Sequence, residues 1–351
     1  MTVARAQPRI VLHVGAPKTA STYLQRRLRA DPEYLRGHRI YVPVLPAVAG
    51  MAGNAKLLAT ALSRRPSLSF QRAFPEIDVG ALDPARLVAE LLAGWRPDVE
   101  SVVLSAENLR PNHACRLRDL LPVSAPCVVV LFVRRQDRWT DSYFSQLVKT
   151  NDINDDIGTF VARLCDTEGE RLCCPDWTAH YEAWRDAFGS CEVVFYDEVC
   201  SDVFAAFVAA AGLEAVPDLL DIDHAQVSLD IHQLAYLLEL ERPIDFSDFV
   251  QHRSASTQAS QQLGLQPARS LLSATDLARL RERFEASNRR LMRMLGRDDE
   301  TTPLRIDATC ASERYCDLRR LHSSGAYARH RQLADAIYAE ATGPRAGPRP
   351  S

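Results

Sequence analysis

Residues 10–22 read IVLHVGAPKTAST, an apolar run that passes directly into a turn of small and hydroxyl-bearing residues. The next residues, YLQRRL, have the composition of a helix. This order predicts a buried strand, a tight turn and a helix start, the local arrangement that cradles phosphate-like anions. An ATP-binding Walker A loop requires G-x-x-x-x-G-K-S/T, whereas Lys18 follows Gly15 after only three positions. The stretch therefore predicts an anion-binding loop of another kind.

Three more apolar runs of strand length occur at residues 101–105, 127–133 and 192–196. They lack polar alternation, so we expect strands that are buried on both faces. The intervening segments are long enough for crossover helices. The chain is therefore predicted to be an α/β protein with a P-loop-like parallel β-sheet flanked by helices on both faces and a helical C-terminal portion. Ligands of such sheets bind beyond the carboxyl ends of the strands.

The sequence predicts one α/β domain over residues 1–297, in which residues 33–80 and 225–297 form loop and helical elements beside the site. Residues 298–341 are expected to be a C-terminal extension, polar and irregular up to about residue 325. The proline- and glycine-containing end, residues 342–351, is expected to be a disordered tail.

Two helices of the C-terminal half carry boundary signals. Ser273, with Asp276 three residues later, predicts a helix start, although glutamate or glutamine is the more usual partner. Gly296 predicts the end of the same helix. A shorter helix is expected at residues 326–341.

Composition narrows the possible functions. The net charge of −3 does not favour nucleic acid or an anionic membrane as a partner. The nine cysteines have no zinc-like spacing, and no apolar run is long enough for a signal peptide or a membrane span. We therefore expect a cytoplasmic protein with reduced thiols and no transmembrane segment.

Lysine occurs at three positions only, Lys18, Lys56 and Lys149, whereas the other basic residues are arginines. A lysine that persists in such a chain points to a need for a compact ammonium rather than a planar guanidinium. Lys18 lies inside the predicted loop and fits this interpretation. Lys56 is explained equally well as a random remainder.

The loop after the first strand supplies several kinds of anion-binding group. Gly15 lets the backbone approach a ligand, and Pro17 stiffens the turn. Hydroxyls and free backbone N–H groups gather at a helix start, where the helix dipole also favours negative charge. The predicted binding residues are Gly15, Ala16, Pro17, Lys18, Thr19, Ala20, Ser21 and Thr22. The alternative is an ordinary strand-to-helix turn with a serine or threonine cap.

A second candidate site follows the run at residues 127–133. Arg134 stands at the end of this strand, and Ser142 comes eight residues later within the predicted helix. An arginine and a serine so placed can grip a phosphate from two sides. The alternative is a solvated, charge-rich helix start, which is common for sequences such as RRQDR.

Together, the two sites resemble the sulfotransferase superfamily. The P-K-x-x-x-T core of its 5′-phosphosulfate loop is present as Pro17, Lys18 and Thr22, although most members have glycine where this chain has Ala20. The arginine and serine of its 3′-phosphate site are also eight positions apart. Four further segments are similar to bacterial members: SAENL at 105–109, RRQD at 134–137, the Trp184 to Asp197 pattern with Phe188, Gly189 and Tyr196, and F-x-x-S-N-x-x-L at 284–291.

The resemblance covers about residues 9–297 and implies an enzymatic activity. The family moves a sulfuryl group from 3′-phosphoadenosine 5′-phosphosulfate (PAPS) to a hydroxyl or amine, leaves 3′-phosphoadenosine 5′-phosphate (PAP) and requires no metal. Lys18 would stabilise the leaving phosphate oxygen, and the backbone N–H groups of residues 19–22 would hold the phosphosulfate. Arg134 and Ser142 would hold the 3′-phosphate. The R-K-G-x-x-G segment that eukaryotic cytosolic members use at that site is not found here.

The acceptor side is less well defined by sequence. The bacterial resemblance implies a hydroxyl on a sugar-containing molecule, such as a glycan, a glycolipid or a glycosylated metabolite, while a small phenol stays open. Glu107, after the second apolar run, is our first candidate for the base that takes the acceptor proton. It could instead be a helix cap or an arginine partner. His13 is the second candidate, with a core histidine as the alternative, and His113 is the third.

Two other functions remain to be tested against this one. A P-loop nucleotide kinase or NTPase would share the sheet and the loop, but it should have the Walker A spacing and an acid for magnesium. A non-catalytic member of the fold would bind a nucleotide or glycan without turnover. The identity of the acceptor and the oligomeric state are not specified by the sequence.

Overall fold

The computed structural model describes residues 8–45, 53–64, 66–166, 174–214, 229–265, 270–297, 302–307 and 316–342. The chain divides into two compact units. The first comprises Met1–Trp139, Cys173–His224 and Phe284–Arg305, and the second comprises Thr140–Leu172, Ala225–Arg283 and Ile306–Ser351. The range that the sequence predicts as one domain is thus shared between both units, and each is described here by itself.

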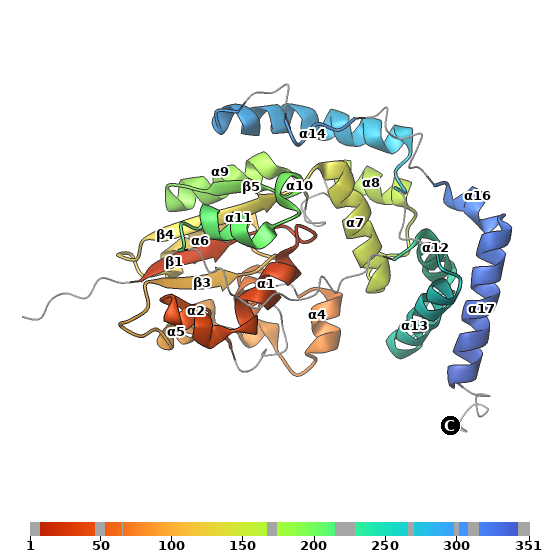
Figure 1. The fold of residues 1–351 in the computed structure, drawn as a ribbon, viewed down its shortest axis with the longest axis horizontal. Coiled ribbons are helices and arrows are strands. Elements are labelled where there is room, and N and C mark those ends of the chain that lie inside the picture. Colours follow the sequence, from red (N-terminus) through yellow and green to blue (C-terminus); the bar gives the residue numbers. More distant parts are fainter. Residues whose placement is uncertain are drawn as a thin grey trace, which may run out of the picture. The chain divides into compact units, whose positions relative to one another are not determined.

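The first unit is built on a five-stranded sheet, as far as the described residues show, with the order β2-β3-β1-β4-β5. All neighbouring strands are parallel (Figure 1). The strands are β1 (Arg9–His13), β2 (Ile40–Tyr41), β3 (Ser101–Ser105), β4 (Cys127–Val133) and β5 (Glu192–Phe195). The four predicted strands are confirmed, while the two-residue β2 is an addition within the range 33–80.

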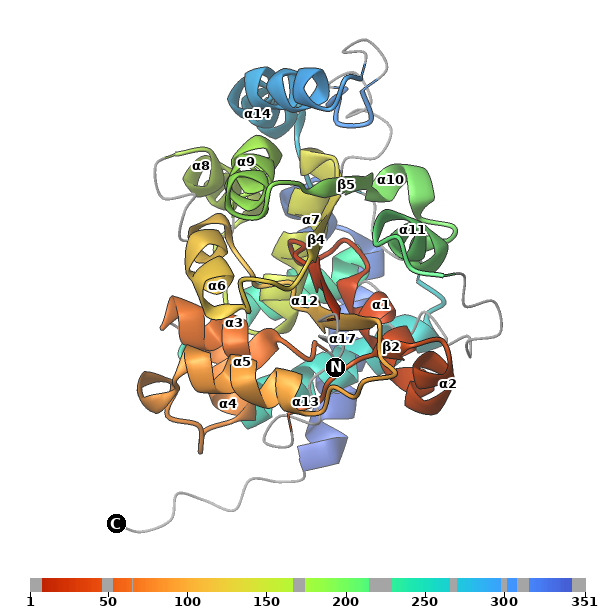
Figure 2. The same cartoon turned by 90° about the vertical axis from the view of Figure 1, so that its left-hand side faces the viewer.

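Helices cover both faces of this sheet, which confirms the predicted fold class (Figure 2). One face carries α1 (Ser21–Ala30), α2 (Pro32–Gly37) and α11 (Val203–Ala210), which follows the short α10 (Tyr196–Val199). The other carries α3 (Lys56–Ser63), α5 (Pro84–Ala93), α6 (Ala114–Leu120) and α9 (Trp177–Phe188). The short elements α4 (Leu68–Ala73), η2 (Val79–Ala81) and η3 (Pro111–His113) complete this part.

The unalternating apolar runs are strands because both of their faces are covered. Val11, Val103 and Val130 contribute to one buried cluster with side chains of α1 and α11, among them Leu24 and Phe207. β-Branched residues suit this position, since their restricted side chains pack well on a pleated surface. Burial of each such side chain contributes about 1.5–3 kcal/mol. Because β1 occupies the centre of the sheet, the loop after it emerges at the middle of the carboxyl edge.

The second unit is helical over its described residues. It contains α8 (Ile157–Cys165), α12 (Ile231–Glu239), α13 (Phe246–Gln262), α16 (Leu318–His322) and α17 (Gly325–Thr342). Two helices pass from one unit to the other, α7 (Gln136–Lys149) after Trp139 and α14 (Ala274–Met294) after Arg283. No helix among the described residues is long and apolar enough to cross a membrane.

The predicted helix boundaries in the C-terminal half are confirmed. Asp276 N–H donates to Ser273 Oγ at 3.2 Å and Ser273 N–H donates to Asp276 Oδ2 at 3.0 Å, so aspartate completes the capping pair. Gly296 ends the helix with a φ of 66°. The helix expected at 326–341 is α17. In contrast, α16 lies in a stretch that was expected to be irregular, and the predicted tail beyond Thr342 lies outside the described residues.

Three buried histidines should make the first unit sensitive to acid. Burial lowers the pKa of His13, His113 and His180 to about 4, with nearby arginines adding to the effect at His113. An unfolded imidazole titrates near pH 6.5, so below that pH the unfolded chain binds protons that the folded unit rejects. The histidines therefore leave the unfolding free energy unchanged above pH 6.5. They reduce it progressively between pH 6.5 and 4, by up to about 3 kcal/mol each.

This expectation can be measured by urea unfolding at pH 4.5–7.5 with tryptophan fluorescence, since all four tryptophans belong to the first unit. The variant His180→Phe should show a shallower loss of unfolding free energy on acidification than the wild type, by about one proton. Equal slopes for the two proteins would show that His180 takes up its proton in the folded state.

Candidate functional site

The loop after β1 has an unusual backbone. Lys18 has a φ of 72° and Ala20 a φ of 61°, so two residues with side chains lie in the left-handed region. This conformation costs about 1–2 kcal/mol for a residue other than glycine. Ala20 is also the N-cap residue of α1, and no side chain caps this helix. The strain explains why glycine suits position 20 in the family that the loop resembles.

Three hydrogen bonds hold this strained loop through its carbonyl groups. Thr19 Oγ1 donates to the Ala16 carbonyl at 3.0 Å, Trp139 Nε1 donates to the Pro17 carbonyl at 2.8 Å, and Arg134 Nη1 donates to the Lys18 carbonyl at 3.0 Å. The carbonyl oxygens of three successive residues, 16–18, thus accept hydrogen bonds from side chains of the protein. A helix start leaves its first amide N–H groups without intrahelical acceptors, and left-handed residues turn such groups toward one concave point. This backbone suits the anion-binding loop that the sequence predicts.

Gly15 is needed for space rather than for its backbone angles. A Cβ atom at this position would lie 3.2 Å from His13 Nε2 and 3.3 Å from Thr19 Oγ1. Its φ is not in the left-handed region. Glycine thus lets the chain pass closely between the imidazole below it and the threonine hydroxyl that braces Ala16.

His13 is a core residue beneath the loop. Its side chain is fully buried, with Nδ1 2.7 Å from Ser105 Oγ and the ring edge-on to Phe132 and Phe207. Gln25 Nε2 also donates to Ser105 Oγ, at 3.1 Å. Because burial lowers the pKa of His13 to about 4, the ring is neutral at physiological pH. The geometry favours the core interpretation of His13 over its role as a base.

Glu107 is brought directly to the loop. Its Oε2 accepts a hydrogen bond from Ser21 Oγ at 2.5 Å, and its Oε1 lies 3.5 Å from Lys56 Nζ. The candidate base and the first residue of α1, which are 86 positions apart in the chain, are thus in contact. Lys56, which lies beside Glu107, is a residue that sequence analysis did not assign to the site. Its only signal was the scarcity of lysine, which could equally have been chance.

The contacts of the hydroxyl groups refine the expected donor set of the loop. Thr19 gives its hydroxyl proton to Ala16 and Ser21 gives its proton to Glu107, so neither proton is available to a ligand in this arrangement. Thr22 is half-buried at the start of α1. An anion would therefore be held mainly by backbone N–H groups and by Lys18, whose side chain starts from the same turn.

Arg134 reaches the loop from the end of β4. Besides its bond to the Lys18 carbonyl, its guanidinium lies over the Tyr196 ring at 4.9 Å, and its own carbonyl accepts from Trp177 Nε1 at 2.7 Å. Stacking and the backbone bond restrict the side chain to one direction. The structure thus brings together Arg134 and Lys18, which the sequence placed in two separate motifs.

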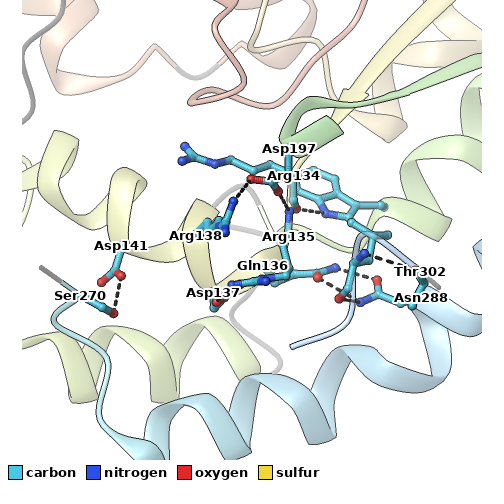
Figure 3. Close-up of polar contacts among 12 residues, drawn as sticks. Arg134, Arg135, Gln136, Asp137, Arg138, Asp141, Asp197, Ser270, Asn288 and Thr302 are labelled. Atoms are coloured by element: carbon cyan, nitrogen blue, oxygen red, sulfur yellow. Dashed lines mark hydrogen bonds and ion pairs between the residues drawn. The ribbon is translucent and has the colours of Figure 1, made fainter. Parts of the chain in front are cut away.

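The RRQD run fixes the start of α7 (Figure 3). Arg135 makes two bonds to the Asp137 carboxylate, at 2.7 and 2.8 Å, and its backbone N–H donates to Asp197 Oδ2 at 3.0 Å. Asp197 Oδ1 accepts from Arg138 Nη1 at 2.8 Å. Asp197, the acid of the Trp184 to Asp197 pattern, therefore joins α10, which follows β5, to the first turn of α7.

A buried pair of amides joins the same helix start to α14 (Figure 3). Gln136 Nε2 donates to Asn288 Oδ1 at 2.7 Å, and Asn288 Nδ2 donates back to Gln136 Oε1 at 3.0 Å. The adjacent Ser287 donates from Oγ to Asp176 Oδ1 at 2.6 Å, at the start of α9. The motif residues thus form a frame that positions Arg134.

Ser142 and His113 are the remaining predicted residues. Ser142 is half-buried in the second turn of α7, within the second unit, where the neighbouring Asp141 accepts from Ser270 Oγ at 2.6 Å (Figure 3). Its role as a phosphate ligand stays a prediction. His113 is buried in η3, and its Nδ1 accepts from the Arg110 N–H at 3.3 Å. This contact makes His113 a capping residue.

No group of three or more histidine, cysteine or acidic residues in the described part of the chain could hold a metal ion.

The strain at Ala20 can be tested by substitution. Ala20→Gly removes the steric cost of the left-handed conformation, which outweighs the added freedom of the unfolded chain. We expect a gain of up to about 1 kcal/mol in the free energy of unfolding, measured by urea titration with tryptophan fluorescence. The matched control is Ala89→Gly on the exposed side of α5, which should lose about 0.5–1 kcal/mol. A loss at both positions would contradict the strained geometry.

Comparisons with known proteins identify a similar solved structure. No protein-family model matches the chain, and no curated protein sequence matches it. A crystal structure of a sulfotransferase from Alicyclobacillus acidocaldarius aligns with 84% of this chain and 97% of its own, with 17% sequence identity and a TM-score of 0.43. At that identity the similarity concerns the fold alone, so we take the site from the contacts of the chain itself.

Proposed function

We propose that the loop after β1 binds the phosphosulfate group of PAPS and that the protein transfers its sulfuryl group to an acceptor hydroxyl. The observation that carries this proposal is the uncapped start of α1, where Lys18 and Ala20 are left-handed and three carbonyls are tied back. A strained backbone that presents amide groups and an ammonium side chain suits an anionic ligand. Glu107 beside it supplies a group that can accept a proton.

Donor binding in this proposal uses groups on two segments. Backbone N–H groups of residues 19–22 and the Lys18 ammonium contact the 5′-phosphosulfate. Arg134 uses one N–H for the Lys18 carbonyl, and a guanidinium has five such donors, so others remain for the 3′-phosphate. Ser142 is the second proposed ligand of that phosphate. The bond between Arg134 and Lys18 would then couple the nucleotide end of the donor to its reactive end.

The transfer step is a displacement at sulfur. The acceptor oxygen forms a bond to sulfur while the bond from sulfur to the bridging oxygen breaks, and the electron pair of that bond stays on the phosphate of PAP. Lys18 stabilises this developing charge. The acceptor proton passes to the carboxylate of Glu107, which has about four lone-pair positions and uses two for Ser21 and Lys56. In this step, Lys18 stabilises the negative charge on the leaving phosphate and Glu107 takes the proton of the acceptor.

The acceptor that we propose is a hydroxyl on a sugar-containing molecule, such as a glycan, a glycolipid or a glycosylated metabolite. The motif resemblance to bacterial sulfotransferases supports this class. The sequence expectations of a cytoplasmic location and of no nucleic-acid partner belong to the same proposal.

Donor binding is best tested by calorimetric titration with PAP, compared with ATP and magnesium. We expect PAP to bind without metal and more tightly than ATP. Lys18→Met should weaken PAP binding at least tenfold, about 1.4 kcal/mol, and reduce turnover of PAPS by about 10²–10³. Arg26→Met, which removes a charge from an exposed position of α1, is the matched control and should change neither value by more than about twofold.

The outcomes separate the candidate functions. Preference for ATP with magnesium would replace sulfuryl transfer with a kinase or NTPase activity. Tight PAP binding without any turnover of PAPS would indicate a non-catalytic binding protein. Equal losses in Lys18→Met and Arg26→Met would show that general charge, rather than the loop, holds the nucleotide.

A further inference from the structure

The position of Lys56 follows from the shortness of β2. Among the described residues, this strand pairs with β3 at Ser101 and Val102 alone, and no strand pairs with the same edge of β3 beyond Val102. The side chain of Asn54 takes that place. Its Nδ2 donates to the Val103 carbonyl at 2.8 Å and its Oδ1 accepts from the Ser105 N–H at 2.7 Å. A carboxamide has the same donor and acceptor as a peptide group, so it extends the ladder by one unit.

This contact fixes the start of α3 at the carboxyl end of β3. Asn54 is buried, and the next residue, Ala55, donates its N–H to the Ser105 carbonyl at 3.2 Å. Lys56 is the first residue of α3. The two residues before it are therefore bound to the strand that leads directly to Glu107.

A lysine at this point contradicts the local preference of a helix. The positive end of the helix dipole lies at the N-terminus and disfavours a cation there, and α3 has no acidic residue in its first turn. Arginine is the usual basic residue of this chain, yet a lysine stands here. A cation at a helix N-terminus with no acidic residue in the same turn is unfavourable for the helix, so such a residue points to a role in a functional site. The available compensation is Glu107, 3.5 Å from the ammonium.

Glu107 in turn lies at two helix starts. Ser21 is the first residue of α1 and donates to Oε2, while Lys56 is the first residue of α3 and lies beside Oε1. Each carboxylate oxygen is thus held from a different segment. The hydrogen bond from Ser21 is directional and the ion pair with Lys56 attracts the other oxygen, so together they restrict the rotation of the carboxyl group about its side chain.

We propose that Lys56 is a positioning residue for the transfer, which aims the carboxylate of Glu107 at the acceptor hydroxyl. This inference rests on the proposed function and adds to it a residue that neither motif contains. Lys56 contacts Glu107 rather than the loop, so its removal should impair proton acceptance while donor binding is retained. Its effect should also disappear when Glu107 can no longer accept a proton.

The test is a double-mutant cycle of Lys56→Met and Glu107→Gln, with PAP release from PAPS and water as the acceptor. We expect Lys56→Met to lower kcat at least tenfold, while KM for PAPS and Kd for PAP stay within twofold. In the Glu107→Gln background, the same change should alter kcat less than twofold. Lys56→Arg, which keeps the charge but not the compact ammonium, should retain more activity than Lys56→Met and less than the wild type. Unfolding curves by tryptophan fluorescence check that each variant is folded.

Several results would overturn the inference. An unchanged kcat in folded Lys56→Met would do so, as would equal losses in the wild-type and Glu107→Gln backgrounds. Weaker PAP binding with unchanged kcat would make Lys56 a donor ligand instead. Failure of the proposed function itself is judged from the wild-type protein alone. The proposed function fails if the wild type does not bind PAP. It also fails if the wild type binds PAP but does not release PAP from PAPS.

Discussion

The bonds from Arg134 and Trp139 to the loop carbonyls are the contacts on which the candidate site depends. Two residues in the left-handed region cost about 1–2 kcal/mol each. The three hydrogen bonds to the carbonyls of residues 16–18 contribute about 0.5–1.5 kcal/mol each. The two sums are of the same size, so the loop keeps its conformation only while the surrounding donors stay in place. Strain of this kind is typical of ligand-binding loops.

The frame behind these donors explains why the motifs are spread along the chain. Arg134 and Trp139 belong to the end of β4 and the first turn of α7, so their aim depends on how that turn is held. Asp197 from α10 and Asn288 from α14 both bind residues at the start of α7. Each of these contacts joins residues more than fifty positions apart. The motifs beyond the loop therefore stabilise the start of α7 together, through hydrogen bonds to other residues of the protein.

A second feature of the site is the meeting of two helix starts at one carboxylate. The parallel sheet directs the beginnings of α1 and α3 toward its carboxyl edge, where Glu107 also lies. Helix starts attract anions, and Ser21 and Lys56 add specific contacts to that attraction. The same edge thus presents the strained loop after β1 and the Glu107 carboxylate side by side. The proposed transfer needs these two elements close together, one for the leaving group and one for the incoming hydroxyl.

The sequence by itself determined four of the five described strands, the helix that starts at Ser273 and ends at Gly296, and the helix near the C-terminus. These features depend on local patterns, namely unbroken β-branched runs, a capping pair and a terminal glycine. It also located the loop and Arg134 as two motifs. Only the tertiary structure decided that Arg134 holds Lys18, that Ser21 binds Glu107 rather than a ligand, and that His13 is a buried core residue. Lys56 and β2 were recognised only there as well, because their partners are distant in sequence. The partner of a side chain depends on the order of the strands in the sheet and on which strand edges lack a neighbouring strand. No local sequence pattern encodes either of these features.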